Sequence, residues 1–416
     1  MSSHATPHQV EPIAFGQRLQ IHRNRRGMSR TVLAGLFGKS PSWVKAVESG
    51  RLQTPKLPMI LRIAEVLRVR DLVDLTGPEV GTSLPTELFI GPGHSRLPAV
   101  RAAVDAYPLT TSRQAPPLEH LRARITRAWT ARHQAPDHRR VIGTLLPDLI
   151  RDAQLAARQA DRATDRRTAQ SLLAQVYALA QFFLAYQPDS SLLWRVAERC
   201  VVAAQESEDP HTIGIAAWLA AEAHRDAAHY DAADAVTEET LRWLAPHRPD
   251  GGDDVRAIAG ALEVAAGYTA ARRGNAGAAW GFWDRARASA DRLPNDYYHP
   301  VTSFSRTVMG AHAVTVAVEL HAGGESVRQA ARADAHTIPS RPRRARHRIE
   351  EARAHQLAGE AETALATLER AHQTAPETIA YNGFARRILL EESESRVPAP
   401  RARASRLAVE IGALAA

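Results

Sequence analysis

The chain has 416 residues, of which 44% are hydrophobic, and it carries a formal net charge of +8 at pH 7. This length allows more than one domain of about 100–200 residues. One cysteine excludes an internal disulfide, and the absence of any run of about eighteen apolar residues excludes a membrane span. The polar start MSSHATPHQVEP has no apolar core for export, so we expect a cytoplasmic protein with residues 1–12 disordered.

The positive charge is concentrated near the N-terminus. Residues 1–77 hold nine Arg and three Lys against three Glu and two Asp, a net charge of +7, so the other 339 residues carry only +1. All three lysines of the chain lie in this part. A local excess of this kind is what neutralisation of phosphates requires. After residue 77 the chain contains Arg but no Lys. We interpret this preference for Arg mostly as the result of a GC-rich genome.

The segment from Ser29 to Arg51 has the pattern of two short helices joined by a tight turn. Gly38 is suited to the turn because it takes positive φ at no cost. Ser40 is expected to cap the second helix, with Pro41 at its first position. Both helices place apolar residues on an inward face: Leu33, Ala34, Phe37, Val44 and Val47. The second helix then presents a polar face outward.

Flanking apolar residues predict three more helices: one that ends near Gly27, one over 60–67 and one over 71–75. Five short helices in residues 13–77 resemble the lambda-repressor-like (Cro/Xre) helix-turn-helix family, on Leu33-Ala34, Gly38, Ser40, Val44, Val47, Glu48 and Gly50. The resemblance implies that the second helix of the pair enters the major groove of double-stranded DNA. The alternative is a generic small helical bundle.

The resemblance also implies which residues contact DNA. Arg30, Arg51 and Lys56 would bind phosphates, which position the protein without reading sequence. The whole set expected to contact DNA is Arg30, Lys39, Ser40, Ser42, Trp43, Lys45, Arg51 and Lys56.

Base-edge contacts are expected from the outward face of the second helix. Ser42, Trp43 and Lys45 are the candidates, and partial burial against the first helix is the alternative for Trp43. Pro41 and Ala46 stand where family members often place amide side chains that read adenine, so apolar contact and DNA shape would matter more here. Glu48, at the helix end, is expected to be a structural hydrogen-bond acceptor.

Residues 78–117 are expected to form a linker between two folding units. Seven prolines fall in this stretch, and only residues 99–106 have a brief helical pattern.

From residue 118 to 394 the sequence is rich in alanine, and its apolar residues recur at steps of three and four. Helices of fifteen to twenty residues with short breaks predict antiparallel hairpins, and no strand-like alternation persists. Three stretches share the same offsets: Ala352, Gly359, Ala364, Leu368, Ala371 and Pro376; Gly267, Gly274, Ala279, Trp283 and Ala286; and, more weakly, Ala221, Tyr230 and Ala233.

These offsets resemble the tetratricopeptide repeat, whose stacked helix pairs curve around a concave surface. The spacing departs from the family's, since Ala233 to Ala279 is 46 residues and Ala279 to Ala364 is 85, which leaves room for one degenerate unit over 304–338. The sequence therefore predicts an all-α protein: a five-helix lambda-repressor-like domain followed by a tetratricopeptide-like α-solenoid. An irregular helical bundle is the alternative for the second part. Residues 395–416 are expected to form a tether and a capping helix.

The repeat offsets place aromatic and charged side chains on the concave face. The expected ligand-binding residues are Trp218, Glu222, Arg225, Tyr268, Arg272, Arg353, Gln356 and Asn382. Such groups suit a peptide or a small organic acid, although Trp218 has the alternative of an ordinary core residue. Helix-turn-helix chains with such tails resemble bacterial quorum-sensing regulators whose repeats bind a secreted peptide, and the head resembles actinobacterial ones. Only four Asn are present, too few for a peptide clamp unless Gln or Arg substitutes, so a small-molecule ligand, a protein partner or no ligand at all stay open.

No catalytic residue, metal site or cofactor is expected. Cys200 lies among apolar neighbours and is expected to be core, and the 18 His show no metal-ligand spacing. The sequence thus predicts a homodimeric transcription regulator that binds double-stranded DNA. The alternative is a repeat-based interaction scaffold or an antitoxin-like partner that uses the helix-turn-helix only for localisation.

Overall fold

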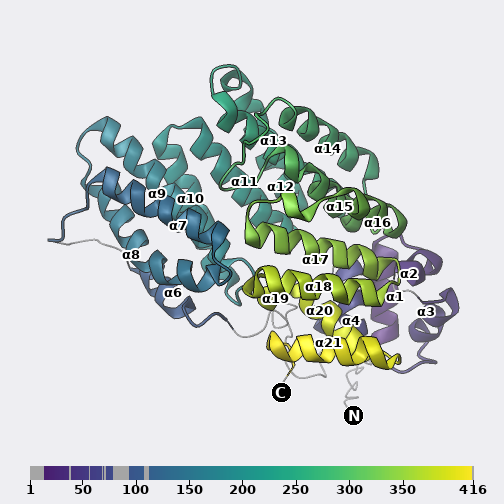
Figure 1. Cartoon of the computed structure of the whole chain (residues 1–416). Coiled ribbons are helices and arrows are strands. Elements are labelled where there is room, and N and C mark those ends of the chain that lie inside the picture. The colour runs from purple at the N-terminus through teal and green to yellow at the C-terminus, as the bar shows by residue number, and fades with distance from the viewer. Residues whose placement is uncertain are drawn as a thin grey trace, which may run out of the picture. The chain divides into compact units, whose positions relative to one another are not determined.

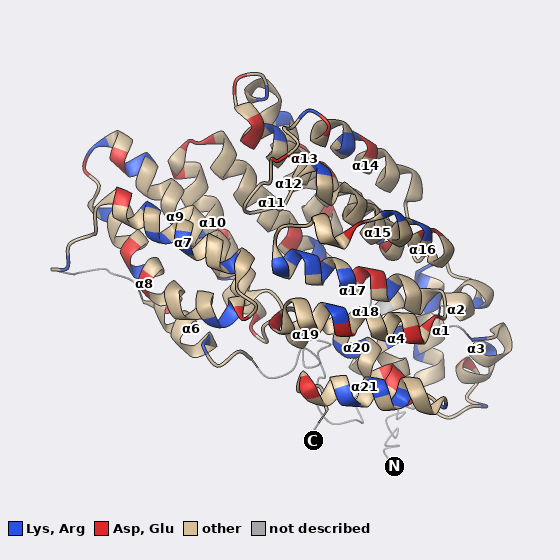
Figure 2. Ribbon diagram, viewed as in Figure 1, with Lys and Arg blue, Asp and Glu red and all other residues tan. Residues whose placement is uncertain are grey.

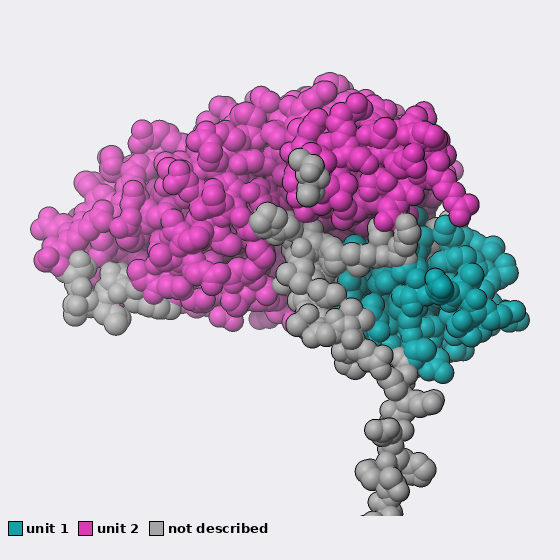
Figure 3. Space-filling view, turned by 90° about the horizontal axis from the view of Figure 1, so that it is seen from below, with its two compact units in different colours: residues 1–89 teal, residues 90–416 magenta. Residues whose placement is uncertain are grey.

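The computed structural model of the protein describes residues 14–36, 39–55, 57–67, 69, 72–77, 93–106 and 112–414. Every regular element in these ranges is a helix, which confirms the expected all-α fold. The chain divides into two compact units, Met1–Phe89 (unit 1) and Ile90–Ala416 (unit 2), coloured separately in Figure 3. No helix in the described ranges is long and apolar enough to cross a membrane.

Unit 1 contains five described helices, as predicted: α1 (Phe15–Arg25), α2 (Arg30–Leu36), α3 (Pro41–Glu48), α4 (Leu57–Leu67) and α5 (Val73–Thr76). The Ser40 hydroxyl accepts a hydrogen bond from the Trp43 amide at 3.1 Å, so the predicted N-cap of α3 is confirmed, with Pro41 as the first helical residue. The turn residues Phe37 and Gly38 lie outside the described residues.

The packing of α1 on α3 depends on a glycine that the sequence analysis did not single out. A Cβ on Gly16 would lie 2.2 Å from the carbonyl oxygen of Val47 and 2.7 Å from that of Glu48. Such distances are shorter than any real contact, so only glycine lets the two backbones approach this closely. The apolar side chains of unit 1 complete one core, which includes Leu19, Leu33, Ala34, Val44, Val47, Ile63 and Leu75.

Unit 2 is a succession of helices that Figure 1 shows in chain order from blue to yellow. They are α6 (Leu97–Asp105), α7 (Leu118–Gln134), α8 (His138–Gln159), α9 (Ala163–Leu184), α10 (Ser190–Ser207), α11 (Pro210–Asp226), α12 (Tyr230–Leu244), α13 (Gly252–Arg272), α14 (Ala276–Ala290), α15 (Met309–Glu319), α16 (Gly323–Arg332), α17 (Arg341–Leu357), α18 (Ala361–Thr374), α19 (Pro376–Tyr381), α20 (Gly383–Ser393) and α21 (Pro398–Glu410). Short 3-10 turns lie at Ala245–His247, Arg306–Val308 and Ala335–Thr337.

Part of the expected linker belongs to unit 2. α6 packs on α8, and its Val100 and Val104 are fully buried in the largest core cluster of this unit. Pro98 does not prevent this helix, because it lies in the first turn, where its missing N–H costs nothing. The expectation of a continuous linker over 78–117 is therefore wrong for residues 97–105.

The hairpins of unit 2 form two layers. The first helices α7, α9, α11, α13, α15 and α17 contact one another in succession, and α8, α10, α12, α14, α16 and α18 each pack outside their own partner. α17 also contacts α7, so the six first helices close into a ring, here called the inner ring. The degenerate unit expected over 304–338 is present as the hairpin of α15 and α16.

The hairpins share one backbone feature. The second residue after the end of α9, α11, α13, α15 and α17 has positive φ in every case: Tyr186, Ala228, Gly274, His321 and Gly359. Glycine takes this conformation without strain, so Gly274 and Gly359 were visible in the sequence. The other three positions carry side chains there, which is why the repeat was hard to recognise.

One carboxylate also joins the last helices of unit 2 to the start of α8. Glu377, at the start of α19, accepts hydrogen bonds from the backbone amides of Arg139 and Arg140 at 2.6 and 3.2 Å, at the N-terminus of α8. His94 Nε2 lies 3.4 Å from the same carboxylate. An anion at a helix N-terminus is favourable because the first amides lack intrahelical partners.

The C-terminal segment differs from the expected tether. Its Arg-rich stretch forms the first turns of α21, which packs on α18 and α20. Leu407 and Ile411 are buried in this packing, whereas Val409 is 38% exposed.

Candidate functional site

The outward face of α3 carries the side chains expected to meet bases. Ser42 and Lys45 are exposed, as is Lys39 before the helix. The hydroxyls of Ser40 and Ser42 lie 2.8 Å apart, so the capping serine also orients its neighbour. Because Ser40 accepts from the Trp43 amide, its oxygen is already engaged in the helix cap. We therefore place Ser40 as a positioning residue.

Trp43 matches the alternative given for it. Its side chain is partly buried and packs against the core of unit 1. The ammonium of Lys39 lies 6.0 Å from the indole ring centroid, which is at the edge of a cation–π contact. The indole thus holds α3 to the core and leaves only part of its surface outside.

Glu48 is confirmed as a structural acceptor. Its carboxylate accepts hydrogen bonds from Arg23 Nε and Arg30 Nε, both at 2.6 Å, and its side chain is almost fully buried. Arg23 also donates to the Met28 carbonyl oxygen. The pair of arginines ties α1 and α2 to the end of α3. The Arg30 side chain is 40% exposed, and its contact with a phosphate stays a prediction.

The remaining cations differ in what surrounds them. Arg51 is exposed and donates only a 3.3 Å hydrogen bond to the Ser49 hydroxyl among the described contacts. Lys56 lies outside the described residues. Lys39, Lys45 and Arg51 therefore form the exposed cationic set on and beside α3.

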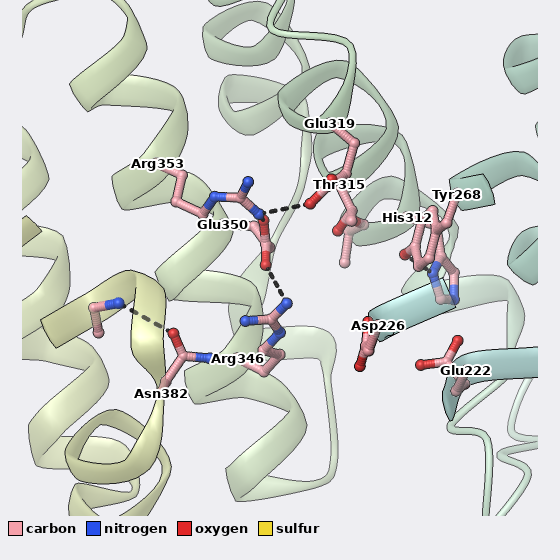
Figure 4. A network of polar contacts seen from close by, with 12 residues as sticks. Glu222, Asp226, Tyr268, His312, Thr315, Glu319, Arg346, Glu350, Arg353 and Asn382 are labelled. Atoms are coloured by element: carbon pink, nitrogen blue, oxygen red, sulfur yellow. Dashed lines mark hydrogen bonds and ion pairs between the residues drawn. The ribbon is translucent and has the colours of Figure 1, made fainter. Parts of the chain in front are cut away.

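In unit 2, the residues expected to bind a ligand lie on successive helices of the inner ring and on α20. Trp218, Glu222 and Arg225 come from α11, Tyr268 and Arg272 from α13, Arg353 and Gln356 from α17, and Asn382 precedes α20. Figure 4 shows part of this region, with Glu222 and Asp226 across from Arg346 and Glu350. Figure 2 shows Lys and Arg recurring along α17 beside acidic residues.

The charged members of this set are paired with carboxylates. Arg272 Nε lies 2.9 Å from Glu319, and Arg353 Nη1 lies 2.9 Å from Glu319 and 2.7 Å from Glu350. Arg346 continues the chain at 2.7 Å from Glu350. Burial alone would raise the pKa of Glu319, but Arg272 and Arg353 hold that pKa well below its usual range.

Glu319 and Glu350 were not predicted from the sequence, although the repeat contains a signal for Glu319. Asp226, Arg272 and Glu319 each lie two residues before the positive-φ residue of their hairpin. This shared position explains why Arg272 reaches both acids, with Asp226 at 3.0 Å and Glu319 at 2.9 Å. When the hairpins are aligned on their positive-φ residues, Glu319 of α15 falls at the same position as Asp226 and Arg272.

The other predicted residues are also engaged. Arg225 pairs with Glu222 at 2.5 Å and lies over the Tyr268 ring, 5.5 Å from its centroid. The Tyr268 hydroxyl is 2.6 Å from His312 Nδ1. Burial raises the pKa of Tyr268 to about 12 and lowers that of His312 well below its usual value, so both groups are neutral at pH 7.

Three predicted residues have structural roles. Gln356 donates to Glu391 at 2.9 Å. The Asn382 oxygen caps α20 by accepting from the Ala385 amide at 3.1 Å. Trp218 is partly buried against the core and lies 6.2 Å from the Phe182 ring, in agreement with the core alternative. The predicted residues therefore lie on neighbouring helices, but most of their side chains are engaged by residues outside the predicted set, chiefly Glu319, Glu350 and Glu391.

Cys200 is confirmed as a core residue. It is fully buried, and its thiol donates to the Ala174 carbonyl oxygen at 3.4 Å. Burial raises the pKa of this thiol to about 12, so the reactive thiolate is absent at neutral pH.

Comparison with known proteins identifies the first unit. Residues 14–75 match a family model described as a helix-turn-helix domain. A solved structure that matches is the crystal structure of Bacillus thuringiensis PlcR in complex with the peptide PapR7 and DNA, which is 12% identical, with 96% of each chain covered and a TM-score of 0.20. No curated protein matches the sequence.

Proposed function

We propose that this protein is a sequence-specific DNA-binding transcription regulator whose second unit senses a ligand. The helix-turn-helix match over residues 14–75 supports DNA binding, and one observation carries it further: α3 has an exposed polar face with Lys39, Lys45 and Arg51 on and beside it. A helix of this kind, fixed by the Glu48 ion pairs, has the dimensions and charge that the major groove accepts.

The protein is proposed to act as a homodimer. Helix-turn-helix proteins bind sites with two-fold symmetry, with the two recognition helices about 34 Å apart, one turn of DNA. A ligand of unit 2 would change DNA affinity only if it bound two dimer arrangements unequally.

Selection of bound DNA from a random pool tests the proposal. The purified full-length protein is incubated with the pool at two salt concentrations, and the retained DNA is sequenced. Enrichment of a palindromic motif at the higher salt is the expected result, because base contacts survive screening better than phosphate contacts. No enrichment at either salt concentration, with binding lost as salt rises, would contradict a sequence-specific function.

Two single substitutions separate base reading from phosphate binding. Lys45→Ala is expected to relax the preference at one position of the motif by about 1–3 kcal/mol. Arg51→Ala is expected to weaken all sequences alike and to reduce the slope of log affinity against log salt by about 1. Equal loss of sequence preference in both variants would contradict these roles, whereas the exposed position Arg25→Ala serves as a charge-matched control on α1.

A further inference from the structure

Arg132 and Arg343 are among the arginines of the inner-ring helices that take no part in the ion-pair network of the ring. Arg225, Arg272, Arg346 and Arg353 have carboxylate oxygens at 2.5, 2.9, 2.7 and 2.7 Å. Arg132 on α7 and Arg343 in the first turn of α17 have no carboxylate within 4.0 Å among the residues that the structure describes. The ring therefore has a neutralised side and a side with surplus positive charge.

These two arginines lie where the ring closes. His133, next to Arg132, has its Nδ1 2.9 Å from the Ser340 hydroxyl, and Ser340 is the N-cap of α17. Arg343 is the third residue of that helix, so both guanidinium groups belong to the junction of α7 and α17. Burial lowers the pKa of Arg132 most, and the charges of Arg139 and Arg343 lower it further.

Arg132 has hydrogen-bond donors that no described residue uses. Its Nε and Nη1 atoms are buried without a partner, and its guanidinium carbon lies 4.1 Å from the Phe182 ring centroid. Burial lowers the pKa of Arg132 to about 10, so the group is still charged at pH 7. A buried cation with unused donors is costly unless an anion satisfies it.

Aromatic side chains lie beside Arg132 and His133 at this junction. Phe182 lies 6.2 Å from Trp218, and Tyr298 lies 5.9 Å from His133, as ring-centroid distances. Burial raises the pKa of Tyr298, yet its side chain and those of Phe182 and Trp218 keep part of their surface accessible. These three aromatic side chains therefore present apolar surface that the protein does not cover completely.

We propose that Arg132 and Arg343 bind the carboxylate of a small ligand whose apolar body packs against Phe182 and Trp218. Guanidinium groups bind carboxylates through paired, charge-assisted hydrogen bonds, and apolar walls with few polar groups are typical of small-molecule sites. The inference deepens the proposed sensing function of unit 2 and rests on it. A free organic acid and the C-terminal residue of a short peptide offer the same carboxylate, and the test separates these two sources.

The first experiment measures binding to the purified full-length protein without DNA, so its failure is distinct from a failure of DNA recognition. The probes are phenylacetate, the neutral phenylacetamide, and the dipeptide Leu-Phe with a free or an amidated C-terminus. Phenylacetate at roughly ten times its Kd is expected to raise Tm by about 2–4 °C, and phenylacetamide to leave Tm unchanged. Tighter binding of free Leu-Phe than of phenylacetate assigns the carboxylate to a peptide, and weaker binding assigns it to a free acid.

Substitutions test the two arginines separately. Arg132→Gln and Arg343→Gln are each expected to weaken phenylacetate binding on the order of tenfold or more. The Tm without probe is expected to stay equal or rise in both, because an unpaired charge is removed. Arg151→Gln is the control, since Arg151 lies on the outer helix α8 and pairs with Asp148. Equal Tm shifts with phenylacetate and phenylacetamide, or unchanged affinity in both variants, would overturn the proposal.

Discussion

Unit 1 and unit 2 bury the same kind of ion pair but organise it differently. In unit 1 a single carboxylate, Glu48, receives Arg23 and Arg30, and the remaining cations lie on the surface. In unit 2 Glu319 and Glu350 share a chain of arginines, and the surplus cations lie inside. In unit 1 the buried ion pairs hold the helices in their relative positions. In unit 2 the interior also contains arginines without a carboxylate partner, and we propose that these hold a ligand.

The sharpest test of the single-carboxylate arrangement is Glu48→Gln. Arg23 is buried and would lose its charged partner, so the free energy of unfolding of unit 1 is expected to fall by about 3–5 kcal/mol. Hydrogen exchange of residues 14–77 in the full-length protein measures this loss. Arg30→Ala should have a smaller effect because that side chain is 40% exposed. Unchanged exchange in Glu48→Gln would show that the pair does not hold the unit together.

The shared network predicts a smaller loss for Glu319→Gln. Arg272 keeps Asp226 and Arg353 keeps Glu350, so we expect unit 2 to lose about 2–3 kcal/mol, measured by hydrogen exchange of α13, α15 and α17. If Glu319→Gln lowered the free energy of unfolding as much as Glu48→Gln does, the shared network of unit 2 would not differ from the single carboxylate of unit 1.

The pH dependence of the same variant sharpens the comparison. Because the pKa of Glu319 is lowered in the folded protein, its contribution is present above the unfolded pKa of about 4.3 and is lost as pH falls through the folded pKa. The difference in Tm between the wild type and Glu319→Gln is therefore expected to shrink below pH about 4. A difference that is constant down to the lowest measurable pH would contradict the lowered pKa.

The close approach of α1 and α3 is tested by Gly16→Ala. The added Cβ would meet the Val47 carbonyl, and we expect a loss of about 2 kcal/mol in unit 1, from thermal or denaturant unfolding. Gly35→Ala on α2 is the matched control, because nothing lies within 4 Å of its Cβ position. That control should stabilise the helix by about 0.5–1 kcal/mol. Destabilisation by both substitutions alike would point to the helices and not to their contact.

The smallest effect is expected where the ring closes. Glu377→Ala removes the acceptor for the amides of Arg139 and Arg140, at a cost of about 1 kcal/mol. Faster hydrogen exchange at the first turn of α8 is the measurement, with the exposed Glu362→Ala on α18 as control. Equal exchange in the two variants would mean that this contact does not join the ends of unit 2.

Local signals in the sequence predicted the elements well. Ser40 with Pro41 marked the start of α3, and Gly274 and Gly359 marked the ends of two inner helices, because each residue type has a direct backbone cause. At Ala228 and His321 the same backbone conformation occurs at residues that carry a side chain, so the residue type did not indicate it.

Long-range charge pairing was beyond the reach of the sequence pattern. The pairing of Arg30 with Glu48, eighteen residues later, was not predicted from the sequence. Glu377 and the α8 amides are separated by more than two hundred residues, and the helices that carry Arg132 and Arg343 contact each other only because the ring closes. Periodicity identifies the inner face of each helix, whereas the partner of a charge on that face depends on how the helices stack.

The closure of the inner ring also limits how this chain can change. In an open array of repeats each unit contacts only its neighbours, so a unit can be gained or lost with the ends unaffected. Here α17 returns to α7, and Glu377 meets the start of α8. Inserting or deleting one hairpin would move these surfaces apart, so the number of hairpins is fixed by the circle they complete.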